Sequence, residues 1–228
     1  MGSSSMKSRG QSSLSNFPFL EISPKHLGPP LEQGFYLRDT VTVAKELLGK
    51  GLFVKRGRAS FLCEIVEVEA YLGENDEASH SFRGLTPRNQ SMFETGGTAY
   101  VYLIYGFYYC INVVTERKGL GSAVLIRAGI PLWGHQEMQA NRKLKGELSL
   151  RDLLSGPGKL TQAMGIDKHL DGQKFNQSHF KIVDLGKKLR DSQYGSSSRI
   201  GISKAKDRKL RFFIKSSPWI SKHLPVSA

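Results

Sequence analysis

The feature that most constrains the fold is a run of twenty residues without a charged side chain, from Gly96 to Thr115. A run of this length could cross a bilayer as a helix. It contains three glycines and Asn112, however, and its tyrosines recur at short intervals. Two β-prone segments flank Tyr105 and Gly106, where a glycine supplies the geometry of a tight turn. The run therefore predicts a β-hairpin rather than a transmembrane helix.

Alternation along the two strands of this hairpin predicts which side chains share a face. We expect Tyr100 and Tyr102 to share a face of the first strand, and Tyr108, Cys110 and Asn112 to share a face of the second. Tyr105 falls at the tip with Phe107 beside it, where there is little core in which to bury a ring. Such a hairpin is either ordinary core or a surface whose exposed rings stack on nucleic-acid bases or wedge between them.

The charge of the chain bears on this choice. The sequence has 33 lysines and arginines against 20 acidic residues, which gives a formal net charge of +13. An excess of this size favours polyanionic partners, either nucleic acid or an anionic membrane surface. Residues 199–228 carry eight basic side chains and one acidic side chain, so part of the basic surface, or a merely solvated face, is expected there.

Length and composition favour one folded domain, because 228 residues with 39% hydrophobic side chains suit a single core. Cys63 and Cys110 lie in apolar, strand-like runs, and we interpret them as buried thiols in a reducing, intracellular compartment. Residues 1–16 contain no apolar core of a secretory signal and are expected to form a disordered tail. We place the folded domain at 17–222 and a short tail at 223–228.

The predicted strands do not alternate strictly with helices. Helices are expected at 39–48, 133–143 and 157–164. Strands are expected at 52–55, 61–71, 123–128, 180–185 and 210–215, and an exposed loop at 187–198. This order predicts an α+β fold: a single domain with a curved, mainly antiparallel sheet, a protruding aromatic β-hairpin and surrounding helices.

Two acidic side chains stand out in the strand predicted at 61–71. On regular alternation, one face of this strand is made by Cys63, Ile65, Glu67, Glu69 and Tyr71. The other face, made by Val66, Val68 and Ala70, is expected to enter the core. A buried carboxylate without a partner is costly. The acids are therefore either ordinary surface residues or include a carboxylate held in a pocket beside an aromatic wall.

Arg127 is the only charged residue in the apolar segment AVLIRA. A guanidinium in such a strand needs a partner, and a carboxylate of the strand at 61–71 is the natural candidate. The pair could be purely structural. A neighbouring arginine would also keep that carboxylate ionised at neutral pH, which a general base requires.

The segment SGPGKL, residues 155–160, places glycines and Lys159 at a predicted helix start. This arrangement favours a phosphate, although an ordinary helix start explains it equally well. Leu160 stands where a Walker A loop requires serine or threonine. The six histidines and two cysteines lack metal-ligand spacing, so neither a metal nor a cofactor is predicted.

Taken together, these segments resemble the alkyladenine (3-methyladenine) DNA glycosylase family from about Tyr36 to Trp219. The resemblance is carried by EVEAYLGENDEASHS, TPRNQSMF, GGTAYVYLIYGFYYCINVV, AVLIRA, SGPGKL, RIGI and SPWIS. It implies a single-domain α+β fold and cofactor-free, metal-free excision of alkylated purines from duplex DNA. It also implies hydrolysis of the glycosidic bond without a lyase step. Residues 167–195 carry no segment of this kind.

The resemblance also implies roles for individual residues. Glu69 resembles the general base, and Arg127 the arginine that helps to hold the attacking water together with the carbonyl of Ile200. The walls that stack on the extruded base would be Tyr71, His80 and Tyr102. Asn112 resembles the residue that crowds the exocyclic amine of guanine. The wedge and its supports would be Tyr105, Phe107 and Tyr108. The implied contacts to the DNA backbone are Arg88, Lys159 and Arg199.

Two other classes of protein fit part of the sequence. A non-catalytic nucleic-acid binder, such as an RNA-binding module, explains the charge and the tyrosines but not Glu69 with Arg127. A hydrolase of free nucleosides explains the acid but not the basic excess. We therefore expect an intracellular monomer, in a nucleus or in the bacterial cytoplasm and nucleoid, that acts on damaged purines in double-stranded DNA without a membrane partner.

Overall fold

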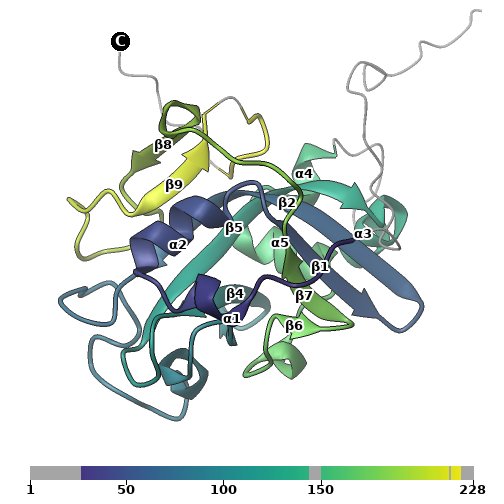
Figure 1. Ribbon diagram of the computed structural model, residues 1–228. Helices are drawn as coiled ribbons and strands as arrows, with labels where there is room; N and C mark the ends of the chain where they lie inside the picture. The colour runs from purple at the N-terminus through teal and green to yellow at the C-terminus, as the bar shows by residue number, and fades with distance from the viewer. Residues whose placement is uncertain (1–26, 144–149, 216, 222–228) are drawn as a thin grey trace, which may run out of the picture.

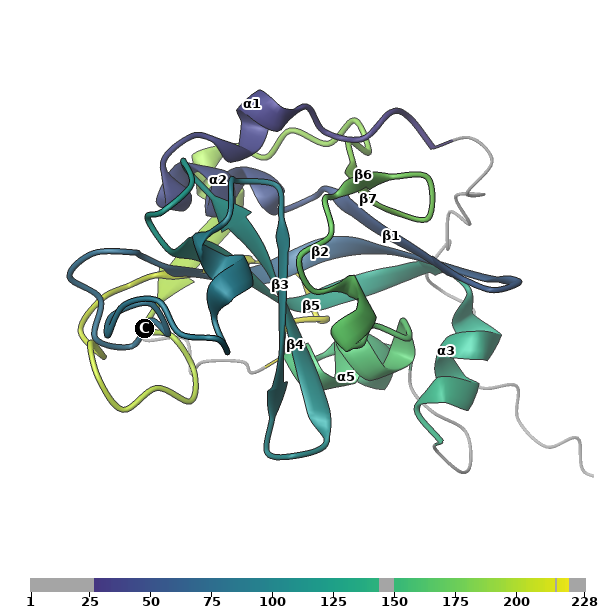
Figure 2. The ribbon, with the colours of Figure 1, turned by 90° about the horizontal axis from the view of Figure 1, so that it is seen from below.

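The uncharged run forms the hairpin that its sequence predicts. The computed structural model describes residues 27–143, 150–215 and 217–221. Strands β3 (Ala99–Ile104) and β4 (Tyr108–Thr115) pair antiparallel, and their turn extends away from the body of the molecule (Figure 2). Among the described residues, no helix has both the length and the apolar character needed to cross a bilayer.

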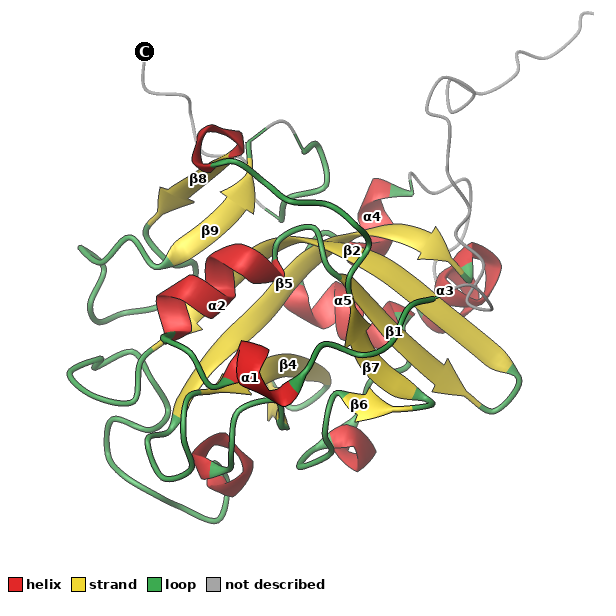
Figure 3. Cartoon of the chain, viewed as in Figure 1, coloured by secondary structure: helices red, strands yellow, loops and turns green. Residues whose placement is uncertain are grey.

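The hairpin is one edge of a curled antiparallel sheet (Figures 1 and 3). The other strands are β1 (Gly51–Arg56), β2 (Ala59–Tyr71), β5 (Ser122–Trp133), β6 (Asn176–Gln177), β7 (Phe180–Val183), β8 (Tyr194–Ser197) and β9 (Arg211–Ile214). Their order is β3-β4-β5-β2-β1-β7-β6, and β9 pairs with both β2 and β8. Every pairing between named strands is antiparallel, so the predicted α+β domain with a curved antiparallel sheet is confirmed.

Short helices surround the sheet. They are α1 (Gln33–Tyr36), α2 (Thr40–Leu47), α3 (His135–Asn141), α4 (Arg151–Leu154) and α5 (Pro157–Ala163), with 3-10 turns at Gln90–Phe93, Lys168–Leu170 and Asp191–Gln193. Asp39 caps α2 by accepting a hydrogen bond from the Thr42 N–H at 2.9 Å. The helix predicted from residue 133 begins later, because Trp133 still pairs with Leu62 in the sheet.

A β-bulge in β2 corrects the predicted alternation. The pairing of β2 with β5 shifts register between Ile65 and Val68. Cys63 and Ile65 consequently pack in the main core together with Val68 and Ala70, whereas Val66 belongs to a separate cluster. A bulge places two successive residues against one partner residue, so the side chains before and after it exchange faces. Glu67, Glu69 and Tyr71 therefore do not share their face with Cys63 and Ile65.

The polar segment at 187–198 is also more ordered than predicted. The sequence predicts an exposed loop, but the second half of the segment forms β8, which pairs with β9 and buries Ser197. A short strand of tyrosine, glycine and serines has no hydrophobic alternation, so its sequence contains no strand signal. This strand positions the segment that begins at Arg199.

Both cysteines are free and buried, as predicted. Burial raises the pKa of the Cys63 thiol to about 12 and that of Cys110 to about 11. The expected tails at 1–16 and 223–228 lie outside the described residues, as do residues 17–26 and 222 of the expected domain.

Candidate active site

A cavity of about 300 Å³ opens beside the hairpin. Its aromatic lining comes from the end of β2, the loop that follows it, and β3 and its turn: Tyr71, His80, Tyr100, Tyr102 and Tyr105. The other residues of the lining include Cys110 and Asn112 of β4, Leu125 of β5, and residues 200–204. The structure thus brings together the four residues expected to bind a base, namely Tyr71, His80, Tyr102 and Asn112.

Strand register explains why these side chains meet. Glu69 of β2 lies opposite Leu125 of β5, which lies opposite Asn112 of β4, which lies opposite Tyr100 of β3. Directly paired residues in neighbouring strands place their side chains on the same face of a sheet. This row therefore runs from the carboxylate to the aromatic wall across four strands.

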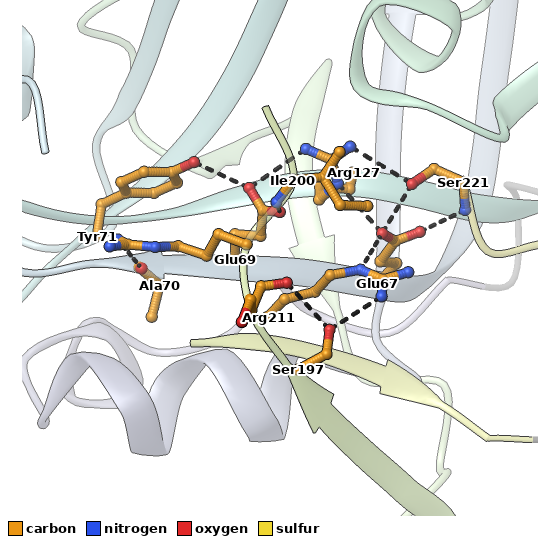
Figure 4. Close-up of polar contacts among 11 residues, drawn as sticks. Glu67, Glu69, Ala70, Tyr71, Arg127, Ser197, Ile200, Arg211 and Ser221 are labelled. Carbon is orange, nitrogen blue, oxygen red and sulfur yellow. Dashed lines mark hydrogen bonds and ion pairs between the residues drawn. The ribbon is translucent and has the colours of Figure 1, made fainter. Parts of the chain in front are cut away.

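Glu69 is fully buried, and its carboxylate has three hydrogen-bond partners (Figure 4). Its Oε2 accepts from the Tyr71 hydroxyl at 2.9 Å and from Arg127 Nη1 at 3.2 Å, and its Oε1 accepts from the Ile200 backbone N–H at 2.7 Å. Tyr71 and Ile200 both line the cavity. All three partners donate, and an ionised carboxylate offers about four acceptor positions, so one position remains for a further donor.

The contact of Ile200 adds to what the resemblance implies. The resemblance assigns its backbone carbonyl to holding a water molecule. The contact found in the structure is its N–H, which donates to Glu69. A backbone donor fixes the orientation of the carboxylate without a side chain that could rotate away.

Arg127 bridges the two carboxylates of β2. Its Nε donates to Glu67 Oε1 at 3.1 Å, while its Nη1 donates to Glu69. Burial lowers the pKa of Arg127, but the charges of Glu69 and Glu67 outweigh burial and raise it above its ordinary value. The predicted pairing of Arg127 with a strand carboxylate is confirmed, and Arg127 stays charged at neutral pH.

Glu67 is held more tightly than Glu69. It accepts from Arg211 Nε at 2.7 Å and from the Ser221 hydroxyl at 2.8 Å, in addition to the Ser221 N–H and Arg127. The side chains of Glu67 and Arg211 are both fully buried. Figure 4 shows Glu67 and Arg211 below Arg127 and Ser221 beside it, on the side away from Tyr71. Glu67 therefore anchors Arg127 and does not face the cavity.

The aromatic wall is internally connected. His80 Nδ1 lies 2.9 Å from the Tyr100 hydroxyl, and the His80 ring meets the Tyr102 ring edge to face at 4.6 Å. Burial and the nearby Arg88 charge hold the pKa of His80 below its ordinary value, so the ring is neutral at pH 7. Asn112 Nδ2 donates to the Tyr100 carbonyl at 2.9 Å, which fixes its amide at the cavity floor. The wall is thus internally hydrogen-bonded and uncharged.

The hairpin tip presents the exposed rings that the sequence predicts. Tyr105 is 77% exposed and Phe107 68% exposed. Tyr105 and Gly106 both have positive φ, 53° and 78°, as primed hairpin turns require. Tyr108 does not line the cavity and instead lies against Gly158 of α5, where an added Cβ would come within 3.1 Å of the Tyr108 Cβ. Tyr108 thus supports the hairpin from the side of α5.

The three expected contacts to the DNA backbone differ in position. Arg88 is exposed and donates to the Leu103 carbonyl at 3.3 Å beside the hairpin. Lys159 is half-exposed at the start of α5, 3.3 Å from the Ser155 hydroxyl. Arg199 is a correction, because its side chain is fully buried and forms an ion pair with Asp76. A guanidinium enclosed in this way cannot reach a phosphate in this conformation.

Sequence reasoning missed several residues of the site. They are Glu67 as an anchor, Asp76, Tyr100, Arg211 and Ser221. Alternation already placed Tyr100 beside Tyr102, and an arginine between Leu210 and Phe212 could have indicated a buried ion pair. Asp76 and Ser221 lie in irregular segments and carry no such signal. Within residues 27–143, 150–215 and 217–221, no cluster of three or more histidine, cysteine, aspartate or glutamate side chains could hold a metal ion.

Comparison with known proteins agrees with this geometry. The profile of the family described as Methylpurine-DNA glycosylase matches residues 34–218. The chain belongs to the methylpurine-DNA glycosylase family. The match covers the whole cavity lining, together with Glu67 and Glu69. A DNA glycosylase hydrolyses N-glycosyl bonds in DNA, so DNA is the substrate class.

Curated relatives of this methylpurine-DNA glycosylase family protein extend over the same region. A protein of Methanoculleus marisnigri is 47% identical over 194 residues, covering 84% of this chain and 98% of the relative. Proteins of Legionella pneumophila (strain Corby) and Chlorobium phaeovibrioides are 46% and 42% identical, and 98% of each is covered, with 84% and 86% of this chain. Each is named "Putative 3-methyladenine DNA glycosylase". These organisms are bacteria and an archaeon, so the nuclear setting gains no support.

Proposed function

We propose that this protein is a monofunctional glycosylase that flips alkylated or deaminated purines out of duplex DNA and hydrolyses their N-glycosidic bond with an activated water, which initiates base excision repair. Its substrate is 3-methyladenine, with ethenoadenine and hypoxanthine as further substrates. The observation that carries this proposal is Glu69, a buried carboxylate between Arg127 and the Ile200 N–H, directly behind a cavity large enough for a purine.

Base flipping is the first step of the proposed reaction. A base inside a duplex cannot reach Glu69, so it must be unstacked at a cost of a few kcal/mol. Tyr105, exposed at the tip of the hairpin, is suited to enter the stack in place of the extruded base. Phe107 and Tyr108, whose rings lie 4.6 Å apart, are suited to support it. The exposed Arg88 and the half-exposed Lys159 are the proposed contacts to flanking phosphates.

The cavity accounts for recognition of the flipped base. Tyr71, His80 and Tyr102 offer ring faces and edges to a purine, and the neutral His80 adds no positive charge. A cationic alkylpurine gains attraction to such electron-rich faces, of about 0.5–2 kcal/mol per contact. The Asn112 amide, fixed by the Tyr100 carbonyl, would crowd the exocyclic amine of a guanine.

Bond cleavage needs a base and an electrostatic partner for the sugar. Glycosidic cleavage passes through an oxocarbenium-like sugar, and the Glu69 carboxylate would stabilise its positive charge. The free acceptor position of Glu69 would take the proton of the attacking water as oxygen bonds to the anomeric carbon. The purine leaves with the electron pair of the glycosidic bond. A cationic lesion becomes neutral as it leaves and requires no acid, whereas hypoxanthine and ethenoadenine require protonation.

The decisive test is Glu69→Gln assayed on duplexes that contain 3-methyladenine, ethenoadenine or hypoxanthine. Loss of the general base should lower the single-turnover rate of base release by about 100-fold or more. Binding of the lesion duplex should remain, because glutamine keeps the side-chain length. Release of free base is measured by chromatography, and binding by fluorescence anisotropy.

Glu64→Gln is the matched control. Glu64 is a buried carboxylate of the same strand, but it pairs with Lys187, whereas Glu69 bonds to Tyr71 and Ile200 of the cavity lining. Its substitution should leave the rate of base release within a few-fold of wild type. A wild-type rate in Glu69→Gln would refute the assignment of the base. Release from free nucleosides but not from duplexes would instead indicate a nucleoside hydrolase, and binding without any release a nucleic-acid binder.

A further inference from the structure

Arg199 lies against the far side of the aromatic wall. Its guanidinium carbon is 4.6 Å from the centroid of the Tyr71 ring, and its side chain is fully buried. Tyr71 also lines the cavity. Because the guanidinium covers one face of the ring, a base that stacks on Tyr71 would lie on the opposite face.

An ion pair holds Arg199 in this position. Both of its terminal nitrogens donate to Asp76 at 2.6 Å, and Nη1 also donates to the Ala70 carbonyl at 2.9 Å. Asp76 in turn accepts from the backbone N–H groups of Leu72 and Ala78. The planar fork of arginine is suited to this bidentate contact and to stacking on a ring.

The pair also connects the two segments that border the cavity. Asp76 belongs to the loop that carries Ala78 and His80, and Arg199 immediately precedes Ile200. The same short segment therefore orients Glu69, through the Ile200 N–H, and the Tyr71 ring, through the guanidinium. The guanidinium carbon lies over the ring, and the Asp76 carboxylate binds the two terminal nitrogens of the same guanidinium.

We propose that Arg199, held by Asp76, is a specificity-determining positioning residue that weakens the preference of the Tyr71 wall for cationic bases and so broadens the site toward neutral purines. This inference rests on the proposed function. A cation on one face of an aromatic ring draws on the electron density that would attract a second cation on the other face. A neutral purine, which stacks mainly by dispersion and burial, is affected less.

The test is the ratio of kcat/KM for release of 3-methyladenine, which is cationic in DNA, to that for hypoxanthine, which is neutral. The variant is Arg199→Met combined with Asp76→Asn, so that neither buried charge lacks its partner. We expect this ratio to rise by about threefold to tenfold, which is within the range of a single cation–π contact. A purely structural role would lower both rates in the same proportion, and that result would overturn the inference.

The matched control is Arg38→Met combined with Glu46→Gln. Arg38 lies 4.7 Å over the Phe35 ring and donates to both oxygens of Glu46, which reproduces the arrangement away from the cavity. This control should leave the ratio unchanged.

If the Arg199 and Asp76 variant does not fold, Arg199→Gln, whose amide can still donate to Asp76, must shift the ratio in the same direction. A wild-type protein that releases neither base would refute the proposed function, whereas release of both with an unaltered ratio would refute this inference alone.

Discussion

Two glutamates of one strand, two residues apart, have different surroundings. Glu67 accepts from two guanidiniums and from Ser221, and none of these partners belongs to the cavity lining. Glu69 has one guanidinium partner and two partners that line the cavity. Both side chains are fully buried, so burial alone does not distinguish an anchor from a base. The identity of the hydrogen-bond donors does.

This difference predicts that Glu67→Gln lowers stability more than Glu69→Gln does, and that Glu69→Gln lowers catalysis more than Glu67→Gln does. Glu67→Gln removes the carboxylate that pairs with the buried Arg211, and breaking a buried ion pair costs about 3–5 kcal/mol of the free energy of unfolding. Glu69→Gln should cost less, because Arg127 retains Glu67. Denaturant unfolding of both variants measures the two decreases in stability. Equal decreases would contradict the division between an anchor and a base.

At the scale of elements, the hairpin and the bulge show where sequence reasoning succeeds and where it stops. The hairpin was predictable because an uncharged run with alternating rings and a central glycine has few other solutions. The bulge in β2 was not, because strict alternation assumes one partner per residue. The prediction therefore placed Cys63 and Ile65 on the wrong face of the strand. It placed Glu69 and Tyr71 correctly on one face, since both follow the bulge.

The turn of the hairpin predicts a separable effect of backbone strain. Gly106 has φ 78° with open space around it, and Gly57, in the turn between β1 and β2, has φ 57° with open space too. Alanine at either position should therefore cost about 1–2 kcal/mol of stability. Only Gly106→Ala should also slow base release from duplex DNA, because it displaces Tyr105.

Comparison of the two glycine variants uses thermal unfolding and single-turnover base release. Similar decreases in stability with a loss of activity confined to Gly106→Ala would support the role of the tip. An equal loss of activity in Gly57→Ala would mean that general destabilisation, and not the position of Tyr105, limits the reaction.

At the scale of the molecule, buried and exposed charges serve different purposes. Three carboxylates, Glu67, Glu69 and Asp76, and three guanidiniums, Arg127, Arg199 and Arg211, are buried together, and their formal charges cancel. The net charge of +13 is therefore carried by the remaining residues. Composition predicts this excess but not which arginines are enclosed. The resemblance assigns Arg199 to a phosphate, because the sequence cannot show that the loop that carries Asp76 encloses Arg199.

The exposed charge predicts how binding depends on salt. Removing one cation that binds a phosphate should make the slope of log K against log salt concentration less negative by about 0.9 for duplex DNA. Lys159→Gln and Arg88→Gln should each change the slope by about this amount, measured by anisotropy between about 50 and 200 mM salt, a range chosen for sensitivity.

Lys188→Gln is the control, because Lys188 is exposed in the groove beside α2, away from the cavity. If the slopes for Lys159→Gln and Lys188→Gln are equal, Lys159 does not belong to the DNA interface. If Lys159→Gln changes the slope but not the rate of base release, Lys159 only positions the duplex.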